Sequence, residues 1–325
     1  MKIFLTGATG FIGGHVLDAL CRQGHTVTCL VRRGKRGASG WQETLSRLQA
    51  RSGVRVVEGE WTQPVQWLAA VAGHEAVVNT VGIIRERRGA SFEAVHTISP
   101  CVLFAEAART GVSKIVQISA LGADEHAQSR FHLSKRAADE FLTRLGVPYV
   151  ILRPSFVYGR GDHSMVFFAR LAQLPVIPLP GNGATRVQPL HVDDLVRAIL
   201  IALERQELAG IRVDLGGSEV LSFEALLTQL AVLQGRRQES LRRLYIPWRF
   251  MRVLALLTDL LGGHGPITSE EYGMLLRENF TDLQSFVAHF GFEPCPFRVG
   301  IWERLARQHA SSLLLHIART PLDTL

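Results

Sequence analysis

Short apolar runs alternate with longer amphipathic segments along the first half of the chain. The apolar runs predict six β-strands, at residues 3–6, 25–31, 54–58, 76–80, 114–119 and 148–152. The amphipathic segments predict helices at residues 11–23, 92–110 and 131–145, each followed by a glycine. Because strands buried on both faces have continuous Val/Ile/Leu runs, this alternation predicts a parallel sheet with helices on both sides.

The regular alternation ends close to Arg153. Residues 174–183 are rich in proline and glycine and predict a loop, and Pro100 is expected to kink or begin the helix that contains it. A helix is expected at 191–204 and a strand at 212–215. The chain after residue 223 is typical of helices, the most apolar of which spans residues 247–261.

These elements predict an α/β fold, a Rossmann-type doubly wound parallel sheet with a smaller, mostly helical C-terminal lobe. Residues 1–153 would form the NAD(P)-binding Rossmann domain, and residues 189–215 would return to it. Residues 154–188 and 216–325 would form the C-terminal lobe, next to the substrate.

A glycine-rich turn, TGATGFIG at residues 6–13, stands directly between the first strand and the first helix. The glycines allow a tight turn, a close approach to a pyrophosphate and close packing of helix on strand. The free N–H groups of the helix N-terminus would then face the phosphates. We therefore expect a dinucleotide to contact a set of residues in this turn: Gly7, Thr9, Gly10, Phe11, Ile12 and Gly13.

The residues after the second strand indicate which cofactor is bound. An acidic residue there would bind the adenosine ribose and favour NAD, but the chain has Arg32 and Arg33. An arginine can pair with a 2′-phosphate, so NADP(H) is expected in preference to NAD(H). Further cofactor contacts are expected at the ends of neighbouring strands, from Glu60, Asn79, Val81 and Gly82.

Composition adds few constraints on function. The 325 residues are 47% hydrophobic, and the formal net charge is +7. The arginines are scattered in small groups, without the basic tract that predicts nucleic-acid binding. Four dispersed cysteines show no metal-ligand spacing and suit a reducing compartment, so no metal is expected. With no signal-peptide pattern and no apolar run of bilayer length, we expect a cytoplasmic protein.

Several motifs resemble the short-chain dehydrogenase/reductase superfamily, in its extended and atypical branches. Besides the glycine turn, they are NTVG at 79–82, ISALGAD at 118–124, LRPSFVYG at 152–159 and PLHVDD at 189–194. In combination with the helical tail they are most similar to the dehydrogenase-like accessory subunit of respiratory complex I and its bacterial relatives. That resemblance implies tightly held NADPH with little or no turnover, and a role in quinone metabolism or in the function or assembly of the respiratory complex.

The resemblance also implies catalytic positions, and one of them is altered. The superfamily uses a Tyr-x-x-x-Lys pair on a helix face, with the tyrosine as general acid/base, and a serine after the fifth strand. Ser119 and Lys135 match the serine and the lysine, which would also contact the cofactor. Phe131 occupies the tyrosine position and has no proton to transfer.

Three interpretations remain open. The protein could bind NADPH without turning it over; another group, from His132, Tyr158, His163 or the substrate, could supply the proton; or the chemistry could need only Lys135. An active NADP-dependent oxidoreductase, or a sugar-nucleotide epimerase or dehydratase with a non-tyrosine acid, is thus the alternative. The residues after the sixth strand are expected at the carboxyl edge of the sheet, with Pro154 and Ser155 near the cofactor and Arg153, Tyr158 and Asp162 near the substrate.

Residues 241–261 mix arginines with large apolar side chains. A basic amphipathic helix can lie in a membrane interface, with its arginines toward anionic headgroups. The other interpretation is a core helix of the C-terminal lobe with arginines at its rim. The first would give peripheral contact with the inner face of a membrane.

Overall fold

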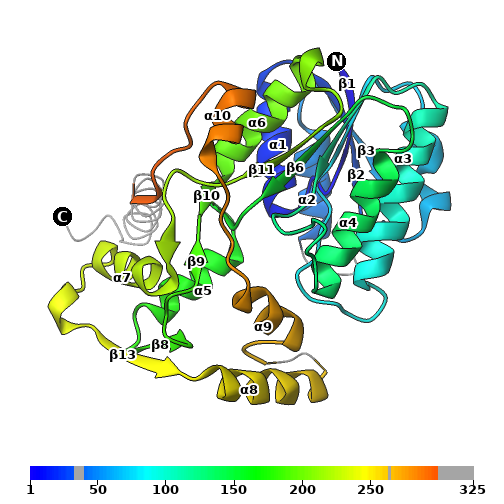
Figure 1. The fold of residues 1–325 in the computed structure, drawn as a ribbon. Coiled ribbons are helices and arrows are strands. Elements are labelled where there is room, and N and C mark those ends of the chain that lie inside the picture. Colours follow the sequence, from blue (N-terminus) through cyan, green and yellow to red (C-terminus); the bar gives the residue numbers. More distant parts are fainter. Residues whose placement is uncertain (33–39, 263–264, 299–325) are drawn as a thin grey trace, which may run out of the picture.

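The computed structural model describes residues 1–32, 40–262 and 265–298, and its centre is a seven-stranded sheet (Figure 1). The strand order is β11-β6-β5-β4-β1-β2-β3, and every neighbouring pair is parallel. The order reverses between β1 and β4, which makes the carboxyl ends of these two strands the topological switch point. The strands are β1 (Lys2–Thr6), β2 (Thr26–Val31), β3 (Val54–Glu58), β4 (Ala76–Asn79), β5 (Lys114–Ile118), β6 (Tyr149–Pro154) and β11 (Ile211–Leu215).

Helices cover both faces of this sheet (Figure 1). One core joins the sheet to α1 (Phe11–Arg22), α6 (Val192–Glu204) and α10 (Leu283–Phe290). The other joins it to α3 (Ser99–Arg109) and α4 (Arg130–Leu142). Pro100 lies in the first turn of α3, directly after a π-helical stretch (Glu93–Ile98), which confirms that this proline begins a helix. The doubly wound fold predicted from the hydrophobic pattern is confirmed.

The smaller lobe lies beyond the carboxyl edge of the sheet and has its own core around Tyr158, Phe223 and Phe297. Three pairs of short strands run through it: β7 (Val157–Tyr158) with β10 (Leu190–His191), β9 (Arg186–Val187) with β12 (Leu221–Ser222), and β8 (Val176–Pro180) with β13 (Arg242–Ile246). Its helices are α5 (His163–Leu171), α7 (Phe223–Leu233), α8 (Trp248–Leu260) and α9 (Ser269–Leu276). Single 3₁₀ turns occur at Pro64–Gln66, Leu68–Val71, Gln206–Leu208 and Gln238–Ser240.

The loop predicted at residues 174–183 is wrong, because β8 occupies Val176–Pro180 and pairs with β13. Pro178 and Pro180 are two residues apart, so their nitrogens point to the same edge of the strand. The amide of Gly181, one position further, donates to the carbonyl of Ile246 in β13, which places the proline nitrogens on the unpaired side. Proline is compatible with a strand in this position.

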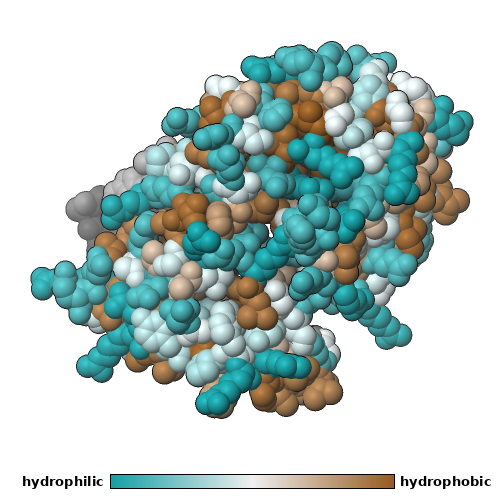
Figure 2. Space-filling model, viewed as in Figure 1, coloured by the Kyte–Doolittle hydropathy of each residue, from teal (hydrophilic) through white to brown (hydrophobic). Residues whose placement is uncertain are grey.

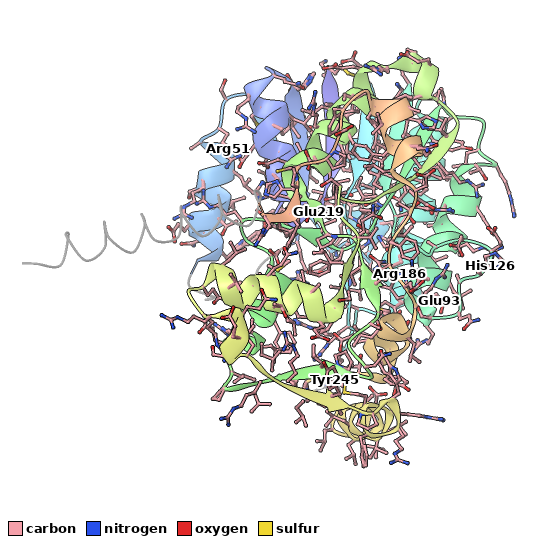
Figure 3. The ribbon with its side chains drawn as sticks, turned by 60° about the vertical axis from the view of Figure 1, so that its left-hand side comes forward. Arg51, Glu93, His126, Arg186, Glu219 and Tyr245 are labelled. Atoms are coloured by element: carbon pink, nitrogen blue, oxygen red, sulfur yellow. The ribbon has the colours of Figure 1, made fainter. Side chains whose placement is uncertain are left out.

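The segment 241–261 is also arranged differently from a continuous helix, because Arg242–Ile246 is a strand and α8 begins only at Trp248. The interpretation of α8 as a core helix is wrong: only Ala255 and Thr258 are buried. Figure 2 shows apolar side chains along the lower edge of the molecule, where α8 lies in Figure 1, and Figure 3 shows Tyr245 of β13 at the same end. Helix α2 (Trp41–Gln49) was not predicted at all.

Candidate functional site

The turn between β1 and α1 depends on two glycines for its shape. Gly7 has a φ of 81°, and a Cβ built on it would lie 2.5 Å from the hydroxyl oxygen of Thr80. A Cβ on Gly13 would lie 2.1 Å from the carbonyl oxygen of Gly7, so helix α1 can approach the turn only without a side chain there. The close packing predicted for this motif is therefore present.

The N-terminus of α1 is open toward solvent. Its N-cap is Gly10, without a side chain to accept from the first amides, and no acidic residue lies in the first turn. Thr9 and Gly10 are exposed, while Phe11 and Ile12 are half-buried. The free N–H groups and the positive end of the helix dipole therefore lie at the switch point, an arrangement that fits a diphosphate.

The residues expected at the adenosine end follow β2 and β3. Arg32 is exposed directly after β2, and Arg33 lies outside the described residues. Glu60 is half-buried after β3, where its amide donates to Gln66 and its carbonyl oxygen accepts from the indole of Trp67. An exposed guanidinium thus follows β2, at the position where the sequence predicts the choice of cofactor.

Asn79 holds the ends of three strands together. Its side-chain oxygen accepts a 2.6 Å hydrogen bond from the Thr6 hydroxyl, and its amide nitrogen donates to Gln117 at 2.7 Å. The side chain is fully buried. Asn79 therefore shapes the edge on which Val81, which is half-buried, and Gly82, which is exposed, follow.

Lys135 lies inside this edge and is buried. Its ammonium donates to the carbonyl oxygens of Val81, at 3.2 Å, and Ile118, at 3.1 Å. Burial lowers the pKa of Lys135 to about 8, against the opposing effect of the Asp139 charge. A Cβ on Gly82 would lie 3.3 Å from the Lys135 ammonium. The lysine thus joins the ends of β4 and β5 at the surface where a dinucleotide would lie.

Ser119 contacts a carboxylate that was not predicted to belong to the site. Its hydroxyl donates a 2.6 Å hydrogen bond to Asp139 Oδ2, and Arg153 Nε lies 3.5 Å from the same oxygen. Burial raises the pKa of Asp139 to about 6, while Ser119, Arg153 and Lys135 oppose the rise. Its other oxygen, Oδ1, has no hydrogen-bond partner among the described residues. The sequence signal was available, because Asp139 follows Lys135 by four residues and shares its helix face.

Phe131 is surrounded by aromatic rings. The rings of His96 and His132 stand edge-on to it, with centroids 5.3 Å and 5.1 Å away. His96 accepts from the Ile83 amide at Nε2 and faces the Ser134 hydroxyl at Nδ1, and burial lowers the pKa of His96 to about 2. The site where the superfamily has a phenol is therefore apolar, beside a neutral imidazole whose two nitrogens are both engaged.

Of the three alternative proton donors in the protein, two are held in other contacts and one is exposed. Burial lowers the pKa of His132 to about 4, and its Nδ1 lies 2.7 Å from the Ser129 hydroxyl. Tyr158 is fully buried in the lobe core, where its hydroxyl donates to the Phe297 carbonyl. His163 is exposed at the start of α5.

The remaining residues after β6 also have contacts within the protein. Ser155 donates to the carbonyl oxygen of Gln188. Asp162 caps α5 by accepting from the Met165 amide, and it also accepts from Gly159. Pro154 is buried at the end of β6, paired across the sheet with β11. A cofactor or substrate contact by these residues stays a prediction.

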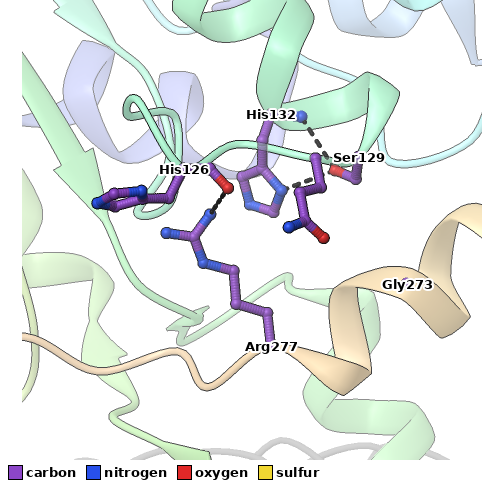
Figure 4. Close-up of a pocket in the computed structure, with 6 residues that line it drawn as sticks. His126, Ser129, His132, Gly273 and Arg277 are labelled. Carbon is purple, nitrogen blue, oxygen red and sulfur yellow. Dashed lines mark hydrogen bonds between the residues drawn. The ribbon is translucent and has the colours of Figure 1, made fainter.

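A cleft of about 260 Å³ opens beside the N-terminus of α4, between the sheet domain and α9 (Figure 4). Arg277 crosses it, donating to the carbonyl oxygens of Gly122 and His126 and pairing with Asp124 at 2.8 Å. The cleft is lined by His132, which directly follows Phe131 in the sequence. Its lining residues are His126, Gln128, Ser129, His132, Gly273 and Arg277. Among the described residues, no group of histidine, cysteine or carboxylate side chains could hold a metal ion.

Comparisons with known proteins agree with this geometry. A family model described as the NAD dependent epimerase/dehydratase family matches residues 3–216. Over 210 residues the chain is 30% identical to the ceramide reductase of Caulobacter vibrioides, and over 261 residues it is 26% identical to subunit 9 of the NADH dehydrogenase [ubiquinone] 1 alpha subcomplex of Arabidopsis thaliana. These matches cover 64% and 78% of this chain, but only 62% of each relative.

One further relative and a solved structure match over almost their whole length. The 2-alkyl-3-oxoalkanoate reductase of Stenotrophomonas maltophilia is 26% identical, with 96% of this chain and 99% of that protein covered. Among solved structures, the UDP-glucose 4-epimerase of Thermotoga maritima superposes with a TM-score of 0.72 at 21% identity, covering 96% of this chain and 99% of the other. At this identity the structural likeness establishes the fold alone.

Proposed function

Because this chain belongs to the NAD-dependent epimerase/dehydratase family, we propose that it binds NADP(H) in preference to NAD(H) and holds it with little or no turnover. The cofactor would lie along the carboxyl ends of β1 to β6, with its diphosphate at the N-terminus of α1. When bound, it supplies a hydride donor or acceptor. The observation that supports the proposal is Phe131, four residues before the buried Lys135 on α4.

The preference for NADP(H) rests on Arg32. It is exposed at the end of β2, and the planar guanidinium can pair with a 2′-phosphate. An acidic residue, which would repel that phosphate, does not follow β2 in the sequence. Arg33 is expected to assist.

The low turnover is inferred from the lack of a proton donor at the position of Phe131. Reduction of a carbonyl needs a proton at the oxygen as the hydride arrives, and Phe131 cannot donate one. His96 is neutral with both nitrogens engaged, and His132 shares its Nδ1 with Ser129. Lys135 donates to two carbonyl oxygens and would retain a positioning role, toward the nicotinamide ribose.

A second candidate function is an active NADP-dependent oxidoreductase, and one observation favours it. Asp139, with a pKa raised to about 6, contacts the Ser119 hydroxyl and could keep it supplied with a proton. Relatives named as a ceramide reductase and a 2-alkyl-3-oxoalkanoate reductase agree with this alternative. An epimerase or dehydratase acting on sugar nucleotides would need the same replacement for the tyrosine.

The physiological setting that we propose is quinone metabolism or the function or assembly of a respiratory complex, at a membrane. The similarity to a mitochondrial NADH dehydrogenase [ubiquinone] subunit supports it. Among the described residues no helix is long and apolar enough to cross a bilayer. The contact that we propose is peripheral, through residues 241–261.

The test is the consumption of NADPH by the full chain in the presence of short-chain quinones, 3-oxoacyl compounds and UDP-sugars. The proposal expects tight binding and a turnover rate no higher than the rate without acceptor. Sustained oxidation of NADPH by any of these acceptors would contradict this proposal and support the second candidate function, an active oxidoreductase. In that case the rate should fall as pH rises through about 6 and lose this dependence in Asp139→Asn.

A further inference from the structure

Helix α8 turns its apolar face away from the protein. Ala255 and Thr258 are the buried residues of this helix, and they face α9 and the lobe. At about 100° per residue, positions 253 and 260 point almost directly away from these two residues, and positions 249, 250 and 257 are among those on either side. Position 249 is an arginine, and the other four hold Phe250, Val253, Leu257 and Leu260, all of them exposed.

The exposed apolar surface extends beyond these four positions. Leu260 is 82% exposed and Leu257 is 52% exposed, values far above those of core leucines. The surface, which we call the α8 face, also includes neighbours on the same helix, on β13 and in the following turn: Leu244, Tyr245, Leu254, Leu256 and Leu261. Leaving so many large apolar side chains exposed to water is unfavourable. A continuous patch of this kind marks a contact surface.

Arginines border the α8 face. Arg249 and Arg252 lie in one stripe of the helix with Leu256, at one side of Val253 and Leu260, and Arg242 is exposed on β13. The helix has one acidic residue, Asp259, which accepts hydrogen bonds from the Ser269 amide. The local charge is therefore positive beside an apolar surface.

We propose that the α8 face inserts into the interfacial region of a bilayer that contains anionic lipids. Phe250, Val253, Leu257 and Leu260 would enter the acyl boundary, and Arg249 and Arg252 would stay at the level of the headgroup phosphates. This inference gives residues and a lipid class to the membrane contact proposed above, and it does not depend on cofactor turnover.

Charge favours a lipid surface over a second copy of the chain. Two copies joined through the α8 face would bring their arginines together, and the nearby carboxylates are already engaged, since Glu224 pairs with Arg243 and Asp259 accepts from the Ser269 amide. Anionic headgroups supply the complementary charge along the whole flank. The place of α8 in the fold agrees, because it lies at the end of the lobe farthest from the sheet (Figure 1), which leaves the nucleotide edge accessible.

The experiment is flotation of the full chain with vesicles of phosphatidylcholine alone or of phosphatidylcholine and phosphatidylglycerol in equal parts. Binding is expected only to the anionic vesicles. The variant Leu257→Asp should weaken it by about tenfold or more, and the pair Arg249→Glu, Arg252→Glu should weaken it by about fivefold per residue. Ile98→Asp, which changes an equally exposed side chain (51%) on the other half of the protein, is the matched control and should float as the wild type does.

Two further readings keep the outcomes distinct. Each variant is titrated with NADPH, so that loss of flotation with unchanged nucleotide binding reports the surface alone; loss of nucleotide binding would instead concern the proposed function. Equal flotation of Leu257→Asp and wild type would overturn the proposal. Failure of the wild type to bind anionic vesicles would also overturn it. If the wild type then formed a concentration-dependent dimer that Leu257→Asp abolished, the occupant of the α8 face would be a second copy of the chain.

Discussion

The Ser119 hydroxyl and the Asp139 carboxylate are joined by a 2.6 Å hydrogen bond in which the serine donates. The serine proton is therefore directed into the protein, and only its oxygen lone pairs remain for a ligand. Asp139 in turn shares a helix face with Lys135 and lies 3.5 Å from Arg153 Nε. The missing phenol at Phe131 is thus accompanied by a serine that is held as an acceptor.

Asp139 makes stability depend on pH in a way that a substitution can isolate. Its pKa, about 6, lies above the value near 3.8 of an unfolded aspartate, so the folded state binds more protons between these values. The contribution of Asp139 to the free energy of unfolding is present at low pH and is lost as pH rises through about 6. The unfolding free energy of wild type minus that of Asp139→Asn should fall by about 1–3 kcal/mol between pH 4.5 and 7. Urea denaturation measures it, and a difference that stays constant would contradict the buried carboxyl.

Two buried histidines act in the opposite direction. The pKa values of His96 and His132, about 2 and about 4, lie below the unfolded value near 6.5, so the unfolded state binds more protons between them. Stability should fall as pH decreases below about 6.5, by roughly 2 kcal/mol per histidine at pH 5. His96→Gln and His132→Gln should each flatten the decline in urea unfolding measured from pH 8 to 5. A decline as steep in both variants as in wild type would place its cause elsewhere.

Adjacent glycines in α1 provide a matched pair of substitutions. In Gly13→Ala the new Cβ would lie 2.1 Å from the Gly7 carbonyl oxygen, a backbone atom, so the turn must shift. We expect a loss of about 1–3 kcal/mol in stability and more than tenfold in NADPH affinity. Gly14→Ala meets its nearest atom, the Ala8 oxygen, at 3.7 Å and should be neutral or slightly stabilising. Thermal unfolding and NADPH titration of both variants measure these effects. Equal stability and equal NADPH affinity of the two variants would contradict the role of this turn in binding the dinucleotide.

Arg32→Ala tests the choice of cofactor. Loss of a charge-assisted contact with a 2′-phosphate should weaken NADPH binding by about tenfold to a hundredfold and leave NADH binding almost unchanged. Arg55→Ala, another exposed arginine, on β3, should alter neither affinity. An equal loss for both dinucleotides in Arg32→Ala would mean that the residue does not read the phosphate.

The sheet was predictable because its signal is local and repeated. Each strand is a continuous apolar run next to a glycine or an amphipathic segment, so strand bounds such as Val54–Glu58 agree with the structure. The lobe was harder, because β8 and β13 pair across more than sixty residues and each is short and irregular in composition. Nothing local indicated that Pro178 and Pro180 face the unpaired edge.

The site was predictable where a motif fixes backbone shape and less so where side chains meet by tertiary contact. Gly7 and Gly13 have the packing that their spacing predicts. Tyr158 and Asp162 have chemistry that suits a ligand, but the structure gives them a core position and a helix cap, which depend on long-range packing. Asp139 was overlooked because a carboxylate on a helix is ordinarily solvated, and its burial follows from the contact with Ser119.

The most direct test of the account is a calorimetric titration of the nucleotide-stripped protein with NADPH and NADH in parallel. We predict that both bind at one site and that NADPH binds at least about tenfold more tightly. Equal affinities would contradict the role of Arg32, and binding of neither would contradict the proposal that this fold is kept for a dinucleotide.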